Sequence, residues 1–143
     1  MKRNGYSLIE LTFVLVLGAL LLAAAAVPIR HARDVMAVRA ARGEVAALLA
    51  LTRATAILAG GATLVVDVDA GAAWIERSPG VRVGDIQHVS ARHGVRLTSS
   101  SSLLNIRYDA LGIGRMSNAT MRVMSGSVTG TITISAYGRV RQS

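Results

Sequence analysis

Residues that could perform catalysis or bind a metal are few and widely separated in this chain. The three histidines are His31, His88 and His93. They lack the close spacing of metal ligands, and the absence of cysteine removes thiolate ligands and nucleophiles. Ser99–Ser102 has no evident histidine and acid partners, and Asp67 and Asp69 fit a solvated strand face beside a turn better than a catalytic pair. We therefore expect no enzymatic activity, no metal site and no cofactor.

One carboxylate near the N-terminus is harder to explain. Glu10 lies in the stretch GYSLIEL (residues 5–11), before the run Leu11–Val27, in which every residue is apolar or glycine except Thr12. As a helix, Tyr6–Val27 would span about 33 Å, enough to cross the hydrocarbon core of a bilayer. A carboxylate in such a segment costs about 2.5 kcal/mol or more. We therefore expect Glu10 to have a function.

Two interpretations of the N-terminal segment compete. In the first, it is an ordinary secretory signal peptide with a basic start, an apolar middle and a small-residue cleavage site at Ala23–Ala26, and its removal releases a soluble β-domain. In the second, it is a membrane helix that is retained. Glu10 favours the second interpretation, because an acid within the apolar block serves no purpose in export.

The helical pattern also continues beyond Pro28. Apolar residues recur there at intervals of three and four, and arginines mostly fill the gaps. Gly60 and Gly61 then end the pattern, as glycine often does at the C-terminus of a helix. We predict one long helix, in which residues 6–28 are hydrophobic all round and span the membrane, and residues 29–60 are amphipathic and continue into the globular part.

From residue 61 onward the hydrophobic period changes to two, which is typical of β-strands. Leu64, Val66 and Val68 alternate with polar residues, and Gly71 suits the positive φ of a hairpin turn. The predicted strands are residues 63–69, 72–76, 86–89, 95–98, 104–108, 121–124 and 131–136. We expect an α+β fold, in which residues 61–143 form a small, mainly antiparallel β-domain that packs on the long helix.

GYSLIEL followed by a long apolar run resembles the class III signal of type IV pilins and type II secretion pseudopilins, whose usual pattern is GFTLIEL. The resemblance implies that residues 1–5 are a leader peptide, which a membrane-embedded prepilin peptidase removes by cutting after Gly5. The new amino terminus at Tyr6, where Tyr replaces the common Phe, would then be methylated. The resemblance also implies that Glu10 pairs with the terminal amine of a neighbouring subunit, which would compensate a buried charge.

Two stretches of the β-domain are similar to the GspH/FimT group of minor pilins. Ile106–Gly112 resembles an aromatic-x-x-x-G element, although Ala110 and Leu111 stand where many relatives have Pro before the glycine. Residues 131–141 resemble the closing strand and tail of that group. The implied protein is a single-pass protein of the bacterial inner membrane with a periplasmic C-terminal domain, incorporated into a pilus or pseudopilus with other pilin or pseudopilin subunits.

Basic residues are concentrated toward the C-terminus. The net charge is +8, and Asp109 is the one acid after residue 85. Such a region suits nucleic acid or anionic lipid. Gly138-Arg139-Val140-Arg141 resembles a G-R-x-R element that, in the FimT branch, is associated with DNA binding during transformation. The two arginines would contact phosphates from one strand face; alternatively, they only solvate a frayed chain end. Other arginines that could widen this surface are Arg92, Arg96, Arg107, Arg115 and Arg122.

The leading interpretation is therefore a non-catalytic minor pseudopilin or pilin, a structural subunit of a type II secretion system or of a type IV pilus. A DNA-binding minor pilin that takes part in DNA uptake during natural transformation is the alternative. A secreted soluble β-domain is the second alternative.

Overall fold

The computed structural model of the chain describes residues 7–77, 80–115, 119–135 and 139–143, apart from the side chains of residues 24–27 and 142. Contacts divide the chain into two units, Met1–Arg33 and Asp34–Ser143, and the long helix α1 contributes to both. In chain order, the elements are α1 (Leu8–Ala59), β1 (Gly61–Asp67), β2 (Ala72–Arg77), β3 (Val81–Gln87), α2 (Val89–His93), β4 (Arg96–Ser99), β5 (Leu103–Asp109), β6 (Ala119–Ser125), β7 (Val128–Ile134) and β8 (Val140–Gln142).

In the first unit, α1 begins immediately after Ser7. The carbonyl of Ser7 accepts hydrogen bonds from the backbone N–H groups of Glu10 at 3.0 Å and Leu11 at 3.1 Å. Its hydroxyl accepts a further bond from the N–H of Ile9 at 3.4 Å. Ser7 therefore satisfies N–H groups that the first turn of a helix leaves without partners.

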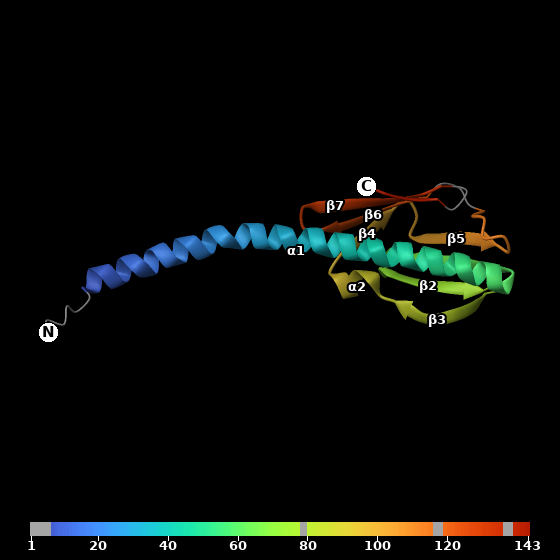
Figure 1. The fold of residues 1–143 in the computed structure, drawn as a ribbon, viewed down its shortest axis with the longest axis horizontal. Coiled ribbons are helices and arrows are strands. Elements are labelled where there is room, and N and C mark those ends of the chain that lie inside the picture. Colours follow the sequence, from blue (N-terminus) through green and yellow to red (C-terminus); the bar gives the residue numbers. More distant parts are fainter. Residues whose placement is uncertain (1–6, 78–79, 116–118, 136–138) are drawn as a thin grey trace. The chain divides into compact units, whose positions relative to one another are not determined.

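The second unit contains two four-stranded antiparallel sheets (Figure 1). The first sheet has the strand order β3-β2-β1-β5, and the second has the order β4-β6-β7-β8. In the first sheet β1 is central, with Val66 opposite Ala73 of β2 and Leu104 of β5. In the second sheet β6 and β7 pair over their full lengths. The long helix and the antiparallel sheets confirm the predicted α+β fold.

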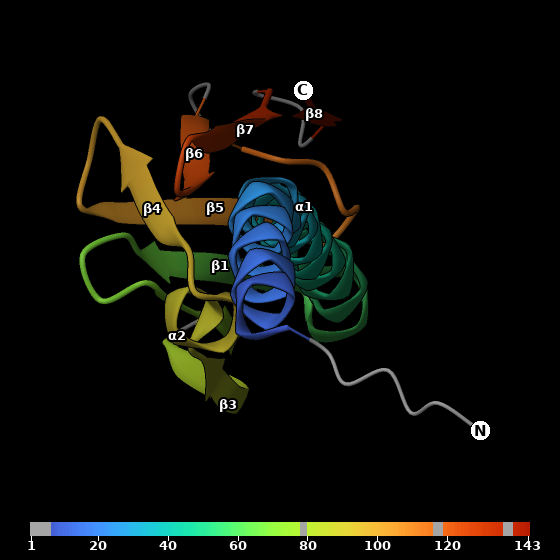
Figure 2. The ribbon, with the colours of Figure 1, turned by 90° about the vertical axis from the view of Figure 1, so that its left-hand side faces the viewer.

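One side of α1 is buried against the sheets of the second unit. Its buried residues are Val38, Ala41, Val45, Leu49, Thr52 and Ala56. Because they are three or four residues apart, they form a single face of the helix. The apolar ones share one core with both sheets, and Figures 1 and 2 show this part of α1 running alongside them. Thr52 fits into the buried face because its hydroxyl donates a hydrogen bond to the carbonyl of Leu48 at 2.6 Å.

Two glycines allow the second sheet to approach α1 closely. A Cβ atom at Gly130 of β7 would lie 2.6 Å from Cδ of Arg42. Gly126, in the turn between β6 and β7, has a φ of +52° and lies against the carboxylate of Asp34. The same carboxylate accepts a hydrogen bond from the hydroxyl of Ser125 at 2.9 Å. The β6–β7 hairpin is thus fixed to the helix by close backbone approach and by one partly buried hydrogen bond.

The structure corrects the predicted strands in two places. The strand predicted at residues 86–89 is wrong in part, because β3 lies earlier in the chain and α2 begins at Val89. The strand β3 is exposed along most of its length and lacks alternation, and the five residues of α2 are too few to show a helical period. The C-terminal stretch is also not a frayed end, because it forms β8, which pairs with β7.

Candidate assembly and binding surfaces

Glu10 is exposed in the first turn of α1. A negative side chain at this position is favoured by the positive end of the helix dipole. Within the described residues, its carboxylate has no hydrogen-bond or ion-pair partner. Gly5 and Tyr6, the predicted cleavage and methylation positions, lie outside the described residues. The pairing of Glu10 with an amine of another subunit therefore stays a prediction.

The N-terminal part of α1 is long and apolar enough to cross a membrane. Its most apolar window of 18 residues has a mean hydropathy of 2.5, and none of this window is buried by the rest of the described chain. Phe13, Leu21 and Leu22, for example, are 65%, 71% and 76% exposed. A helix with apolar side chains on all sides needs lipid or other helices around it.

The second-unit part of α1 carries an exposed apolar stripe on the side opposite its buried face. The stripe consists of Met36, Ala40, Gly43, Ala47, Leu51, Ala54 and Leu58. These residues follow one another at intervals of three or four, so they lie along one line of the helix. The three large ones are the most prominent, since Met36, Leu51 and Leu58 are 70%, 55% and 88% exposed. Such a line of small and apolar residues permits close packing of another helix.

Arg139 and Arg141 belong to an outer face of the second sheet that contains two more arginines. Val123 and Ile132 of this sheet point into the core, and side chains alternate along strands. Arg141, opposite Thr133, and Arg122, opposite Thr131, therefore point outward. We call this surface the arginine face, and its members are Arg96, Arg122, Arg139, Arg141, Thr98, Thr120, Thr131 and Thr133. The described strands of this sheet contain no acidic residue.

The backbone hydrogen bonds next to β8 explain why Arg139 and Arg141 point to the same side of the sheet. The ladder between β7 and β8 continues to the residue before β8, because the N–H of Ser135 donates a hydrogen bond to the carbonyl of Arg139 at 2.9 Å. The N–H of Arg139 donates in turn to the Ser135 hydroxyl at 3.2 Å. These bonds place Arg139 in the same outward register as Arg141. Gly138, the first residue of the G-R-x-R stretch, lies outside the described residues.

Three of the arginines considered from the sequence do not join this face. Arg92 pairs with Glu44 of α1 at 2.7 Å, and Arg115 pairs with Asp109 at 3.2 Å. Arg107 lies in β5 and belongs to the other sheet. The basic surface is therefore narrower than the sequence indicated, but threonines that the sequence interpretation did not include surround it.

Side chains considered for catalysis have structural partners instead. One carboxylate oxygen of Asp67 accepts a hydrogen bond from the N–H of Ala70 at 2.8 Å, which stabilises the β1–β2 turn. The Ser99 hydroxyl donates to the carbonyl of Thr120 at 3.0 Å. Nε2 of His93 lies 2.5 Å from a carboxylate oxygen of Glu44. Among the residues that the structure describes, no three His, Asp or Glu side chains are grouped as metal ligands.

The Tyr108–Gly112 element forms a tight turn that docks on α1. Tyr108 is buried, and Gly112 has a φ of +70°. A Cβ atom on Gly112 would lie 3.0 Å from Cδ1 of Ile57 and 3.1 Å from Nε of Arg53. Glycine is therefore required at this position both by the backbone conformation and by the nearby helix. The aromatic residue and the glycine thus have distinct packing functions.

Asp109 stabilises the same turn from within. Its carboxylate accepts hydrogen bonds from the N–H groups of Leu111 and Ile113 at 3.0 and 2.9 Å. The bond from Ile113 is the main reason why the pKa of Asp109 lies below its usual value. Burial raises the pKa of Asp109, whereas Arg115 and the N–H of Leu111 lower it further.

Comparison with known proteins places the second unit in a defined group. Residues 41–138 match the family described as "Type II transport protein GspH". Crystal structures of the type IV minor pilin FimU from Pseudomonas aeruginosa PAO1, in two crystal forms, have a similar fold. For one, the identity is 14%, the TM-score is 0.60, and the match covers 74% of this chain and 87% of that one. For the other, the identity is 15%, the TM-score is 0.57, and the match covers 73% of this chain and 91% of that one. No curated protein sequence matches this chain.

Proposed function

Because this chain belongs to the GspH family of type II transport proteins, we propose that it is a minor pilin or pseudopilin, a non-catalytic structural subunit of a membrane-anchored filament. The N-terminal part of α1 would cross the bacterial inner membrane, and the domain after it would be periplasmic. The filament would belong to a type II secretion system or a type IV pilus. The observation that carries this proposal is the uncovered apolar surface of α1.

The two parts of this surface fit successive steps of assembly. Before assembly, the uncovered N-terminal part of α1 is stabilised by lipid, because its side chains are apolar on all sides. In a filament, the same side chains would pack on helices of neighbouring subunits. The exposed stripe from Met36 to Leu58 would extend helix packing into the second unit, where lipid is absent.

Glu10 gives the assembly its register. In the lone subunit, a carboxylate at this depth of the bilayer is unfavourable. After cleavage by a prepilin peptidase at Gly5, the α-amine of Tyr6 supplies a positive charge. If the amine of one subunit meets Glu10 of the next, both charges are compensated, and only one axial offset between the helices allows this.

The sequence of the mature amino terminus tests this proposal. Mass spectrometry of protein purified from membranes is expected to show a chain that begins with N-methylated Tyr6. A mature chain that begins near Ala25 or Val27 would instead support an ordinary signal peptide and a secreted β-domain. Deletion of the gene separates the two machines, since a secretion subunit is required for export of proteins and a pilus subunit for surface fibres.

DNA binding is a second candidate function, and the arginine face favours it. Four arginines point outward from one sheet, with threonine hydroxyls between them. They can contact phosphates without repulsion from a carboxylate, because the described strands of this sheet contain no acidic residue. Arg139 and Arg141 lie at the edge of this sheet, where a bulky duplex could reach them. A minor pilin with this surface would bind DNA outside the cytoplasm for uptake.

DNA binding is tested with the full-length protein in nanodiscs made from zwitterionic lipid. A labelled duplex is expected to bind in a salt-dependent way, and Arg139→Ala/Arg141→Ala should make the negative slope of log K against log salt shallower by about two. Arg107→Ala/Arg82→Ala, which removes two arginines of the other sheet, is the matched control. Equal weakening by both pairs would show a nonspecific effect of net charge and would exclude this site.

A further inference from the structure

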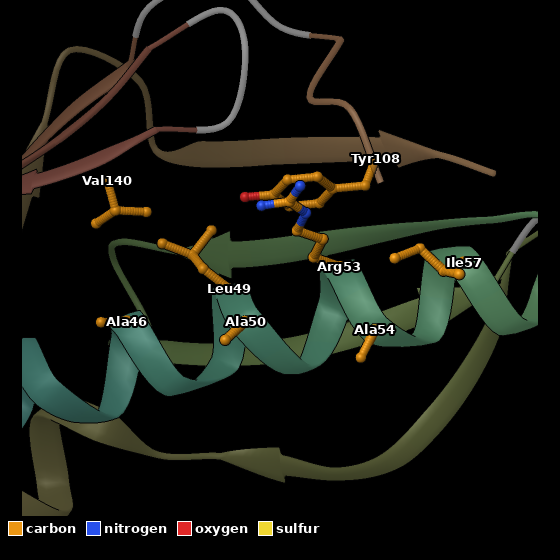
Figure 3. A pocket seen from close by; sticks show the side chains of 8 residues that line it. All are labelled: Ala46, Leu49, Ala50, Arg53, Ala54, Ile57, Tyr108 and Val140. Carbon is orange, nitrogen blue, oxygen red and sulfur yellow. The ribbon is translucent and has the colours of Figure 1, made fainter. Parts of the chain in front are cut away.

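An open groove of about 670 Å³ lies along one flank of α1 in the second unit. Helix α1 forms its floor, and Tyr108 of β5 and Val140 of β8 stand opposite (Figure 3). The groove therefore separates the edge strand of one sheet from the edge strand of the other. It is distinct from the arginine face, whose side chains point outward from the second sheet.

Small side chains make the floor of the groove shallow. Ala46, Ala50 and Ala54 are four residues apart and lie on one face of the helix. Leu49 and Ile57 add larger apolar side chains beside this row, on the side that faces Tyr108. Because alanine has no side chain beyond Cβ, the backbone of a second polypeptide could come close to α1 here.

Two polar groups interrupt this apolar surface, and both are hydrogen-bond donors. The guanidinium of Arg53 and the hydroxyl of Tyr108 face the groove (Figure 3). In the described part of the chain, neither group has a hydrogen-bond or ion-pair partner. Burial raises the pKa of Tyr108 more than the charge of Arg53 lowers it, so the hydroxyl keeps its proton at neutral pH. An acceptor in the groove would satisfy both donors.

The wall formed by β8 offers backbone groups as well. Ser143 and Thr131 exchange both backbone hydrogen bonds across β7 and β8. Hydrogen-bonded and non-hydrogen-bonded residue pairs alternate along an antiparallel ladder, so Val140 and Ile134 form a non-hydrogen-bonded pair. The N–H and C=O of Val140 therefore point away from β7. An edge strand with outward backbone groups is a site where an extended peptide can add.

We propose that this groove binds an extended, apolar segment of a partner protein, which places the carboxylate of one Asp or Glu between Arg53 and Tyr108. A carboxylate presents two acceptor oxygens to two donors and matches the charge of the guanidinium. The apolar floor favours the flanking side chains of such a segment over the sugar–phosphate backbone of a nucleic acid. This inference goes beyond the proposed structural role, and it holds whether or not the protein is part of a filament.

The test uses the full-length protein in nanodiscs and a fluorescein-labelled probe peptide of sequence Thr-Val-Thr-Glu-Thr-Val-Thr. The control peptide has Gln in place of Glu. We expect the Glu peptide to bind about tenfold more tightly or better, as measured by fluorescence anisotropy, because it forms charge-assisted hydrogen bonds. Arg53→Gln should abolish this preference, and Tyr108→Phe should reduce it. Ala50→Trp should fill the groove and weaken binding of both peptides.

Arg39→Gln is the matched control, because Arg39 is an exposed arginine of the same helix that does not line the groove. It should leave the preference for Glu unchanged, and circular dichroism should show that all variants keep the wild-type fold. Equal binding of the two peptides, equal effects of Arg53→Gln and Arg39→Gln, or no binding at millimolar peptide would overturn the proposal. Self-association of the chain that Ala50→Trp abolishes would also overturn it, because a second copy would then occupy the groove.

Discussion

The carboxylate of Glu44 on α1 lies 2.5 Å from Nε2 of His93 on α2, although the two residues are 49 positions apart in the chain. The other carboxylate oxygen of Glu44 accepts a hydrogen bond from Arg92 at 2.7 Å. The side chains of Glu44 and His93 are only 16% and 20% exposed, whereas that of Arg92 is 55% exposed. Glu44 is therefore the central residue of a contact that fixes the short helix to the long one.

Glu44→Ala is expected to destabilise the protein by about 1–3 kcal/mol, because it leaves the largely desolvated His93 without its hydrogen-bond acceptor and removes one acceptor of the more exposed Arg92. Arg92→Ala should cost less than about 1 kcal/mol, since its pair with Glu44 is more exposed to solvent. Urea unfolding of both variants measures the difference. If Arg92→Ala is the more harmful substitution, the contact between Glu44 and His93 contributes little.

Two glycine substitutions should change stability in opposite directions. Gly130→Ala should cost about 1–3 kcal/mol, because its new Cβ would collide with Arg42 and with the stiff, buried Val38 of α1. Gly43→Ala should stabilise the protein by about 0.5–1 kcal/mol, since Gly43 is helical and has nothing within 4 Å of a new Cβ. Thermal unfolding tests both. A neutral Gly130→Ala would show that the sheet and the helix are less closely packed.

The turn at Asp109 should make stability depend on acid pH. The pKa of Asp109 is lower in the folded chain than in the unfolded one, mainly because of the hydrogen bond from Ile113. Its contribution is therefore fully present above the unfolded pKa, which is about 3.9, and is lost as the pH falls through the lower folded value. Asp109→Asn should lower Tm at neutral pH and should differ less from the wild type in strong acid.

Asp85→Asn is the control for this pH dependence, because Asp85 is an exposed carboxylate of β3. Its Tm should follow that of the wild type at every pH. A constant difference in Tm between Asp109→Asn and the wild type, from neutral to strongly acidic pH, would contradict the assignment to Asp109.

Local patterns in the sequence were sufficient for most elements of the fold. The helix and six of the predicted strands agree with the structure to within a few residues, because Val38, Val45 and Leu49 show the helical period and Leu64 and Val66 show the strand period. The pattern failed at β3, where neither face is covered and alternation is absent. It also failed at α2, whose burial depends on Val89 alone.

The surfaces could be predicted less well, because they depend on which strands become neighbours. Nothing in the local sequence indicates that Arg122 and Arg141 share one sheet face, or that Arg92 is paired with Glu44. The groove at Arg53 is created by Tyr108 and Val140, which lie far away in the sequence. Residue spacing predicts which side of an element a residue faces, whereas partners across the fold follow from strand order.

Glu10→Ala should leave membrane insertion and cleavage intact but weaken incorporation into filaments. In the proposed processing, insertion would depend on the apolar run, which the substitution extends, and cleavage would depend on the sequence around Gly5. If Glu10 pairs with the amine of a neighbouring subunit as proposed, loss of the carboxylate would leave that amine without an acceptor in an apolar environment, and assembly should become less favourable. Glu10→Gln should behave in the same way, because it retains the size of the side chain but not its charge.

Incorporation is measured as the ratio of the variant in sheared filaments to the variant in membranes. Asp85→Ala is the control, because it removes an exposed carboxylate of β3, far in the sequence from the apolar N-terminal part of α1. Its ratio should equal that of the wild type, whereas both Glu10 variants should show a ratio reduced about tenfold or more, as expected for loss of a charge-assisted contact. Wild-type incorporation of Glu10→Gln would show that charge pairing does not determine the register of the subunits.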